Sequence, residues 1–174
     1  MRLQAADYRA DERLRDGRAL EIRALKPDDK TDMLAAVTRI GAQSMRRRFF
    51  GAKRDFSAAE QAFYLNVDFV KHVALVAVVE EGDRAAIVGG GRYVVAEPGS
   101  AEVAFAVVDA LQGQGIGSAL LRHLIRIARD AGLSELIAEV LPENAAMLKV
   151  FERSGLKVTT RREASTVHVR MQIS

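Results

Sequence analysis

Three glycines at alternate positions precede an aliphatic segment in the stretch DALQGQGIGSALL, residues 109–121. The first N–H groups of a helix have no partner within the helix and carry the positive end of its dipole. Glycines ahead of such a helix leave out the Cβ atoms that would keep an anion away from those groups. A strand-to-helix turn with positive φ explains one or two glycines. Three at this spacing therefore favour an anion site over a simple turn.

Two common phosphate-binding loops do not fit this stretch. A P-loop requires Lys followed by Ser or Thr directly after its last glycine, whereas Gly117 is followed by Ser-Ala. The dinucleotide fingerprint requires G-x-G-x-x-G after the first strand of a βαβ unit, whereas the glycines here are Gly113, Gly115 and Gly117. The stretch instead fits Gln/Arg-x-x-Gly-x-Gly/Ala, with Gln112 at the first position.

The segments around the glycines alternate between strand and helix patterns. β-branched or alternating runs predict strands, and apolar residues at helical spacing predict helices. The predicted strands are 19–25, 72–80, 85–96, 101–108, 135–141, 156–160 and 165–173. The predicted helices are 27–40, a second helical segment over 41–50, 57–66, a helix from the glycines to Gly132, and 143–155. The helix after the glycines has one apolar face, made of Leu120, Leu121, Leu124, Ile125 and Ala128.

This order predicts an α/β (α+β) fold. The turns EEGDR and EPGS join three strands into an antiparallel meander. The helix between strands 101–108 and 135–141 makes a parallel, right-handed βαβ unit. We therefore expect one mixed, mostly antiparallel sheet with helices on both faces, in a single domain over 18–174. Residues 1–17 are polar with little periodicity, and we expect a frayed arm or a marginal helix there.

The composition excludes several classes of function. The chain has 174 residues and no cysteine, which excludes disulfides, thiolate metal sites and thiol nucleophiles. Its histidines, His72, His123 and His168, do not form a metal-ligand spacing with nearby acids. The net charge of +3 suits a polyanionic ligand, but the absence of Trp and the few aromatic residues argue against nucleic acid. No signal peptide or bilayer-spanning run is visible, so we expect no membrane partner and a cytoplasmic protein.

The glycine stretch, Asn144 and the segment VFERSGL at 150–156 together resemble the GCN5-related N-acetyltransferase (GNAT) family, with the right element order from about residue 19 to 172. The segments SMRRRFF (44–50), VDFVKHVALVAV (67–78) and AEVAFAVVDALQGQGIG look like the bacterial Pat-type protein-lysine acetyltransferases. The resemblance implies the GNAT fold, with strands 101–108 and 135–141 splayed apart, and acetyl-CoA as cosubstrate.

The resemblance also implies where acetyl-CoA binds. Its pantetheine arm would lie between the splayed strands and bond to backbone near Val107 and Val108, where a bulge would also turn an N–H toward the oxyanion. Asn144 would contact the cosubstrate, be a helix N-cap, or both. The pyrophosphate would lie on the backbone amides of Gln112, Gly113, Gln114, Gly115, Ile116, Gly117 and Ser118. A solvated basic face explains Arg122, Arg126 and Arg129 more simply than contact with the 3′-phosphate does.

The transfer reaction needs a base, because a lysine amine has a pKa near 10.4 and attacks a thioester only when neutral. Glu102 is the one carboxylate within the run AEVAFAVV. It shares a strand face with Ala104 and Ala106, so we expect partial desolvation that raises its pKa. A solvated glutamate near a strand end is an equally good explanation from the residues alone. The Pat-type resemblance favours the base.

One residue departs from the family pattern. Many relatives have Tyr seven residues after the asparagine, as the acid for the leaving thiolate, and here that position is Phe151. With no cysteine, transfer is expected to be direct rather than through an acyl-enzyme. The implied acceptor is a protein lysine, with acyl-CoA synthetases as one class of substrate. The alternatives are a small-molecule amine and a non-catalytic acyl-CoA-binding module. Minor candidates near the acceptor are His72 and the arginines at 46–48.

Overall fold

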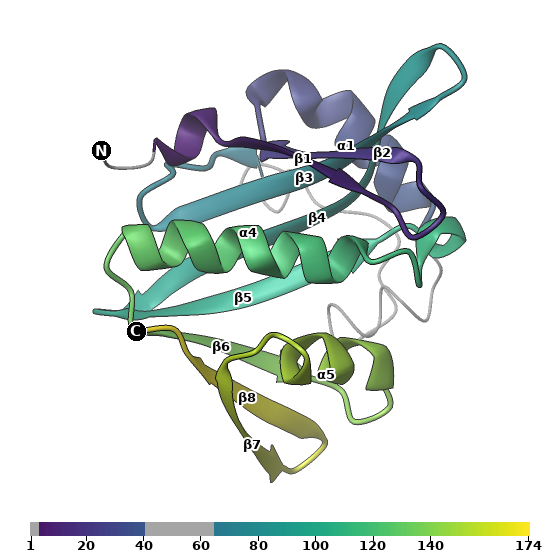
Figure 1. Ribbon diagram of the computed structural model, residues 1–174. Coiled ribbons are helices and arrows are strands. Elements are labelled where there is room, and N and C mark those ends of the chain that lie inside the picture. Colours follow the sequence, from purple (N-terminus) through teal and green to yellow (C-terminus); the bar gives the residue numbers. More distant parts are fainter. Residues whose placement is uncertain (1–3, 41–64) are drawn as a thin grey trace.

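The structure is a computed structural model that describes residues 4–40 and 65–174. Within these ranges, eight strands form one sheet in the order β1-β2-β3-β4-β5-β6-β8-β7 (Figure 1). All neighbours are antiparallel except β5 and β6, which are parallel, so the predicted mixed sheet is confirmed. The strands are β1 (Arg9–Arg13), β2 (Ala19–Ala24), β3 (His72–Glu81), β4 (Arg84–Glu97), β5 (Ser100–Val107), β6 (Glu135–Val140), β7 (Lys157–Glu163) and β8 (Thr166–Gln172).

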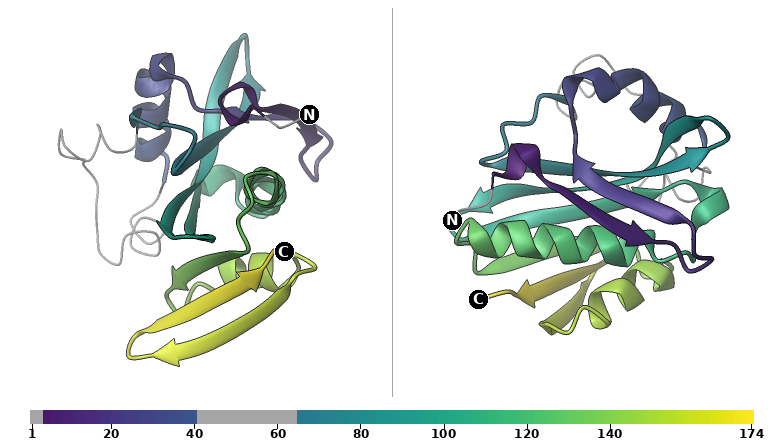
Figure 2. Two further views of the ribbon diagram at one scale, coloured as in Figure 1. Left: turned by 90° about the vertical axis from the view of Figure 1, so that its left-hand side faces the viewer. Right: turned by 45° about the horizontal axis from the view of Figure 1, so that its top comes forward.

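Helices cover both faces of the sheet. One face carries α1 (Lys30–Thr38), and the other carries α4 (Ile116–Asp130) and α5 (Ala145–Glu152) (Figure 2). Short 3₁₀ turns are η1 (Ala5–Asp7), η2 (Pro27–Asp29) and η3 (Asp109–Leu111). The second helical segment at 41–50, and the helix at 57–66 up to residue 64, lie outside the described residues. Among the described residues, no helix is both long and apolar enough to cross a membrane.

Helix α4 packs on the sheet through the face that its sequence predicts. Its five predicted core residues are all buried, and the described core continues from them into β3, β4 and β5. Gly132 follows the helix with φ 86°, as expected of a C′ glycine. The helix crosses the strands closely, because a Cβ atom on Gly91 of β4 would lie 3.2 Å from Cδ1 of Leu124 in α4 and 2.7 Å from Cδ1 of Phe105 in β5. The glycines of β4 thus let α4 and β5 approach.

The expectation for the N-terminal arm was wrong. Residues 9–13 form β1, which pairs antiparallel with β2 from Arg9↔Arg23 to Arg13↔Ala19. Apart from the short 3₁₀ turn η1, the described arm contains no helix. Charged residues occupy both faces of this edge strand and hide its alternation, while Tyr8 and Leu14 on either side of it are buried. The arm is therefore packed against the domain rather than frayed.

Strands β5 and β6 pair along only a short part of their length. Their parallel register runs from Ser100↔Glu135 to Glu102↔Ile137 and then stops. Beyond it, β6 continues against β8, from Glu135↔Gln172 to Val140↔Val167. The remaining part of β5, residues 103–107, therefore has its β6-side edge open. This confirms the splayed parallel pair.

Candidate active site

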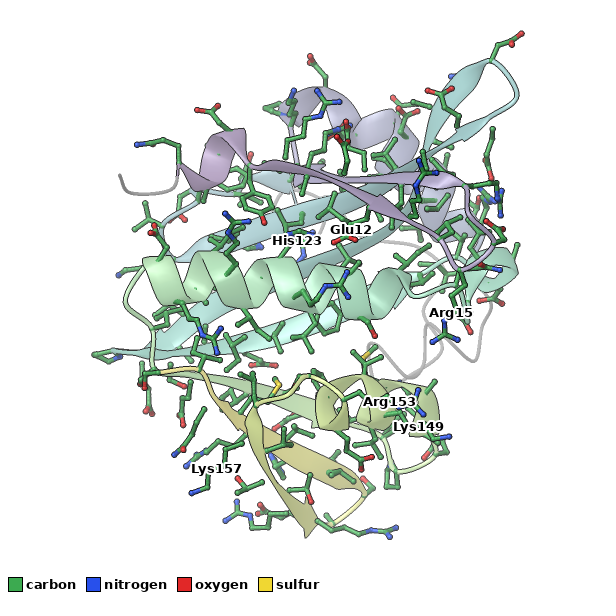
Figure 3. All side chains as sticks on the ribbon, in the orientation of Figure 1. Glu12, Arg15, His123, Lys149, Arg153 and Lys157 are labelled. Carbon is green, nitrogen blue, oxygen red and sulfur yellow. The ribbon has the colours of Figure 1, made fainter. Side chains whose placement is uncertain are left out.

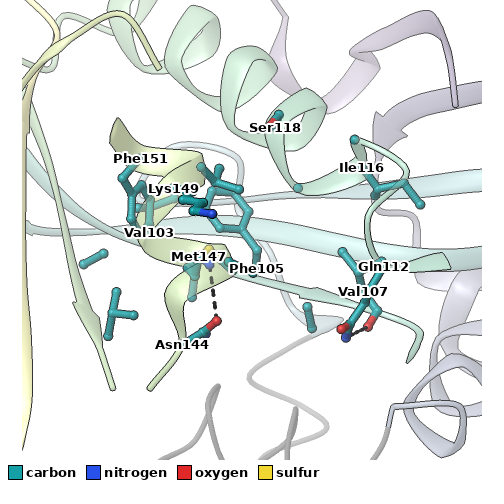
Figure 4. Close-up of a pocket in the computed structure, with 18 of the residues that line it drawn as sticks. Val103, Phe105, Val107, Gln112, Ile116, Ser118, Asn144, Met147, Lys149 and Phe151 are labelled. Atoms are coloured by element: carbon teal, nitrogen blue, oxygen red, sulfur yellow. Dashed lines mark hydrogen bonds between the residues drawn. The ribbon is translucent and has the colours of Figure 1, made fainter. Parts of the chain in front are cut away.

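A pocket of about 550 Å³ opens where β5 and β6 diverge. Its walls are β5, β6, the first turn of α4 and one face of α5 (Figure 4). Most of the site residues predicted from the sequence line it. These are Glu102, Val107, Gln112, Gly113, Gly115, Ile116, Gly117, Ser118 and Asn144. Val108 and Gln114 do not line it.

The first turn of α4 presents free backbone donors to this pocket. The helix begins at Ile116 after Gly115, which has φ 90°, and no described side chain caps it. Its first turn contains no acidic residue. The amides of Ile116, Gly117 and Ser118 therefore have no partner within the helix, and all three residues line the pocket. Together with the dipole, this is the geometry of an anion site.

The two glutamines of the loop hold its shape. The side chain of Gln112 donates to the carbonyl of Val107 and to Asp109, both at 3.3 Å. Gln114 accepts from the turn between β1 and β2, where its backbone carbonyl takes the N–H of Arg15 and its side-chain oxygen takes the N–H of Asp16, each at 3.1 Å. The N-terminal segment, which the sequence predicted to be a separate arm, therefore holds the anion-binding loop in place.

Hydrogen bonding along β5 separates the roles of Val107 and Val108. The N–H of Val108 donates to the carbonyl of Val88 at 2.9 Å, so it is used within the sheet. Because bonding alternates along an antiparallel pair, the N–H of Val107 points away from β4, toward the opening beside β6. The bulge expected at 107–108 was wrong. The register of β4 with β5 is regular there and shifts only at its other end, between Val95 and Glu97.

Asn144 is the N-cap of α5, since its side-chain oxygen accepts the N–H of Met147 at 3.2 Å (Figure 4). It is only 9% exposed and lines the pocket. Its amide nitrogen has no hydrogen-bond partner among the described residues. A buried donor without a partner is costly. The predicted N-cap role of Asn144 is confirmed, and its side-chain NH₂ group is available to donate to a ligand.

Glu102 lines the same pocket but lies in a different environment from the one predicted. It pairs with Val94 of β4 and Ile137 of β6. Its side chain is exposed, although Ala104 and Ala106 on the same face are partly buried. The desolvation expected from its neighbours is therefore not observed, because alanines are too short to cover a glutamate. Glu102 precedes Val107 by five residues, roughly 17 Å along an extended strand.

Phe151 fills the position where many relatives have tyrosine. The residue is 1% exposed and lines the inner wall of the pocket. Its ring packs against Phe105 with centroids 6.0 Å apart. A ring in this position has no proton to donate, so it contributes packing and shape to the site.

Three basic side chains at the pocket went unnoticed in the sequence. They are Arg15, from the turn between β1 and β2, and Lys149 and Arg153, from α5 and its C-terminal end. The arginines considered from the sequence do not line it: Arg122 pairs with Glu12 at 2.9 Å, and Arg129 donates to the carbonyl of Ile173 at 2.7 Å. The i, i+4 spacing on α5 was a usable signal, because it puts two cations on one helix face.

The histidines are committed elsewhere. His72 is buried and accepts from Arg92 at 2.8 Å. Burial and, next, the charge of Arg92 lower the pKa of His72 to about 4, so the ring is neutral near pH 7. His123 contacts Tyr8 and Glu12, and His168 lies 3.4 Å from Glu139. No cluster that could hold a metal occurs among the described residues.

The chain matches a known family and curated relatives. Residues 42–156 match the model of the acetyltransferase (GNAT) family. Acetyltransferase PA5475 of Pseudomonas aeruginosa is 32% identical over 137 residues, covering 78% of this chain and 74% of that protein. Acetyltransferase Pat of Mycolicibacterium smegmatis is 32% identical over 144 residues, covering 82% of this chain. The match spans only 42% of that longer Pat protein.

Solved structures share the fold. The GNAT domain of S. lividans PAT superimposes with a TM-score of 0.85 at 34% identity, covering 94% of this chain and 96% of that domain. The acetyltransferase yncA of Salmonella typhimurium, solved with acetyl-CoA, superimposes with a TM-score of 0.68 at 20% identity. That match covers 88% of this chain and 92% of yncA and shows the same fold.

The pocket fits acetyl-CoA on three independent features. Uncapped amides at the start of α4 suit the pyrophosphate. The open edge of β5 and the amide nitrogen of Asn144 suit the amides of the pantetheine arm. The walls around Phe105 and Phe151 are apolar. With the family match over most of its length, the chain belongs to the acetyltransferase (GNAT) family and takes acetyl-CoA as its cosubstrate.

Proposed function

We propose that this chain transfers the acetyl group to a lysine ε-amine of a protein, with Glu102 as the general base. Two observations support the proposal. Of the described residues that line the pocket, only Glu102 and Glu139 are acidic, and Glu102 lies on β5, the strand whose open edge faces β6. The similarity to the Pat proteins of two bacteria favours a protein acceptor, and acyl-CoA synthetases are the first class to test.

The residues of the site divide the chemistry among them. Acetyl-CoA supplies an activated acyl group. Glu102 takes the proton of the attacking amine through bridging water molecules, because five residues of β5 separate it from Val107. The N–H of Val107 donates to the carbonyl oxygen as it gains charge. The first turn of α4 holds the pyrophosphate.

Phe151 leaves the departing thiolate without a side-chain acid. A thiol has an unperturbed pKa near 8.5, so the thiolate leaves readily and takes its proton from water. The absence of cysteine means that the amine attacks the acyl group directly, with no thioester on the enzyme.

The experiment compares Glu102→Gln with Glu139→Gln, which removes the other pocket carboxylate. Thiol release is measured with acetyl-CoA and purified acyl-CoA synthetases, and acetyl-CoA binding is measured by calorimetry. We expect Glu102→Gln to lose about 100-fold or more in kcat with unchanged binding, as loss of a general base does. The kcat of Glu139→Gln should stay within about threefold of the wild-type value, since Glu139 takes no part in the proposed proton transfer.

Two outcomes would redirect the proposal. If Glu102→Gln kept the wild-type rate across pH, Glu102 would not be the base. If wild type acetylated polyamines or free amino acids but no protein, the acceptor would be a small-molecule amine.

A third outcome corresponds to a non-catalytic acyl-CoA-binding module, which the buried Phe151 favours over a tyrosine-bearing site. In that case wild type would bind acetyl-CoA but transfer to none of the acceptors. The binding measurement separates this outcome from a failure of the acetyl-CoA site itself.

A further inference from the structure

Three cations at the mouth of the pocket have no partner among the described residues. Arg15, Lys149 and Arg153 line the pocket, and their side chains make no hydrogen bond or ion pair with any described residue. Other described arginines near this face are paired, for example Arg18 with Asp16 and Arg122 with Glu12. Three cations that line one pocket and form no ion pair with a described residue favour a polyanion.

We propose that Arg15, Lys149 and Arg153 bind the 3′-phosphate of acetyl-CoA from two sides, with Arg15 supplied by the turn between β1 and β2. The amides at the start of α4 account for the pyrophosphate. The 3′-phosphate is the other strongly anionic group of the ligand, and the three cations supply its counter-charge. The inference rests on the acetyl-CoA site of the proposed function and does not depend on the acceptor.

The turn that carries Arg15 is fixed to the anion-binding loop. The N–H of Arg15 bonds to the carbonyl of Gln114, and the next N–H bonds to the Gln114 side chain. Within the turn, Arg13 donates to the carbonyl of Gly17 at 2.9 Å. The backbone of Arg15 is therefore held beside the loop, while its side chain bonds to no described residue.

The strand before this turn is fastened to α4 itself. His123 of α4 meets the hydroxyl of Tyr8 at 2.5 Å and Glu12 at 2.8 Å. Arg122 donates to the same Glu12 oxygen at 2.9 Å. Burial alone would raise the pKa of Glu12. The hydrogen bonds from Arg122 and His123 outweigh burial, so the pKa of Glu12 lies below its usual value. These contacts hold the hairpin against the helix whose first turn would bind the pyrophosphate.

The opposing side is a pair of cations on α5. Lys149 and Arg153 are four residues apart and line the same pocket. Figure 3 shows them at α5, with Arg15 above them beside the N-terminal end of α4. Like charges at this spacing destabilise a helix. A bound phosphate offsets that repulsion, so the pair of cations destabilises the ligand-free protein more than the ligand-bound one.

The test measures binding of two ligands to Arg15→Ala by calorimetry. The ligands are acetyl-CoA and acetyl-3′-dephospho-CoA, which lacks only the 3′-phosphate. We expect Arg15→Ala to weaken acetyl-CoA about 10-fold, the loss of one exposed charge-assisted hydrogen bond. Binding of acetyl-3′-dephospho-CoA should change less than about twofold. Lys149→Ala and Arg153→Ala should behave in the same way.

Arg162→Ala is the matched control. Arg162 is exposed on β7, does not line the pocket, and its side chain forms no hydrogen bond or ion pair with a described residue. It should leave both affinities unchanged, which separates a local contact from a general loss of positive charge. Thermal unfolding of each variant checks that the fold is intact.

Two results would overturn the inference. Equal weakening of both ligands by Arg15→Ala would mean that Arg15 contacts the pyrophosphate or shapes the loop. No weakening of either would mean that Arg15 binds nothing. If wild type bound neither ligand, the acetyl-CoA site would fail, and the proposed function with it.

Discussion

Two clusters of glycines in this chain use the same residue for opposite reasons. Gly89, Gly90 and Gly91 lie within β4, under helix α4, and Gly113, Gly115 and Gly117 lie just before that helix or in its first turn. In the strand, side-chain volume is the constraint. In the loop, space is open and backbone conformation is the constraint. A run of glycines therefore identifies a functional loop only when the reason for each glycine is known.

The strand glycines are required by close packing. A Cβ on Gly91 would lie 2.7 Å from Cδ1 of Phe105, and one on Gly89 would lie 3.1 Å from the carbonyl of Ala106 and 3.2 Å from Ile116. None of the three has positive φ. Their absent side chains set the depth at which α4 sits on the sheet, and hence where its first turn meets the pocket.

The loop glycines meet the opposite situation. Gly113 and Gly115 have φ of 84° and 90°, and a Cβ on either would meet no atom within 4 Å. That conformation costs other residues about 1–2 kcal/mol. Gly117 lies in the helical region, and its Cβ would lie 3.8 Å from Val150. Alanine would therefore fit there, which agrees with the Gly/Ala alternative at the end of the family pattern.

The largest expected effect is on Gly91. Gly91→Ala should lower the free energy of unfolding by about 2–3 kcal/mol, because the Phe105 ring is buried and cannot move aside. Denaturant unfolding measures it. Gly90 faces the opposite side of the sheet, where an added Cβ would lie 3.3 Å from the Leu75 carbonyl oxygen. Gly90→Ala should therefore lower the free energy of unfolding by less. Equal losses at the two positions would contradict the packing explanation.

The next effect separates backbone strain from ligand binding. Gly115→Ala should cost about 1–2 kcal/mol of stability and weaken acetyl-CoA about 10-fold or more, since relief of strain shifts the first amides of α4. Gly82→Ala is the control, because Gly82 also has positive φ and open space but lies in the turn between β3 and β4. It should cost similar stability and leave the Kd unchanged. A change in Kd for both would point to global destabilisation.

The smallest expected effect is at Gly117. Gly117→Ala should change the free energy of unfolding by no more than about 0.5 kcal/mol, in the stabilising direction, since alanine favours helix. Acetyl-CoA affinity, measured by calorimetry, should stay within about threefold. Gly117→Val adds volume next to Val150 in the pocket and should bind more weakly. Protein packing leaves room for a methyl group at Gly117. A severe loss of acetyl-CoA binding in Gly117→Ala would therefore contradict this prediction and show that the ligand itself occupies that space.

The sequence predicted the parts of the molecule that depend on local pattern. The buried face of α4, the order of strands and helices, the glycine loop and the cap at Asn144 all follow from spacing along one segment. The prediction for residues 1–17 failed because charges on both faces of β1 remove the alternation that identifies a strand. The bulge at 107–108 failed because register depends on the neighbouring strand, which the segment itself does not encode.

The sequence by itself determined the family and predicted the acetyl-CoA site and the candidate base, since these rest on a few short local motifs. Only the tertiary structure decided which donors are free. It showed that the N–H of Val108 is used by Val88, that Glu102 is exposed, and that Arg15 lines the same pocket as residues of α5. These facts depend on hydrogen-bond partners and solvent access. Both are set by segments that lie far apart in the chain, and no local pattern records them.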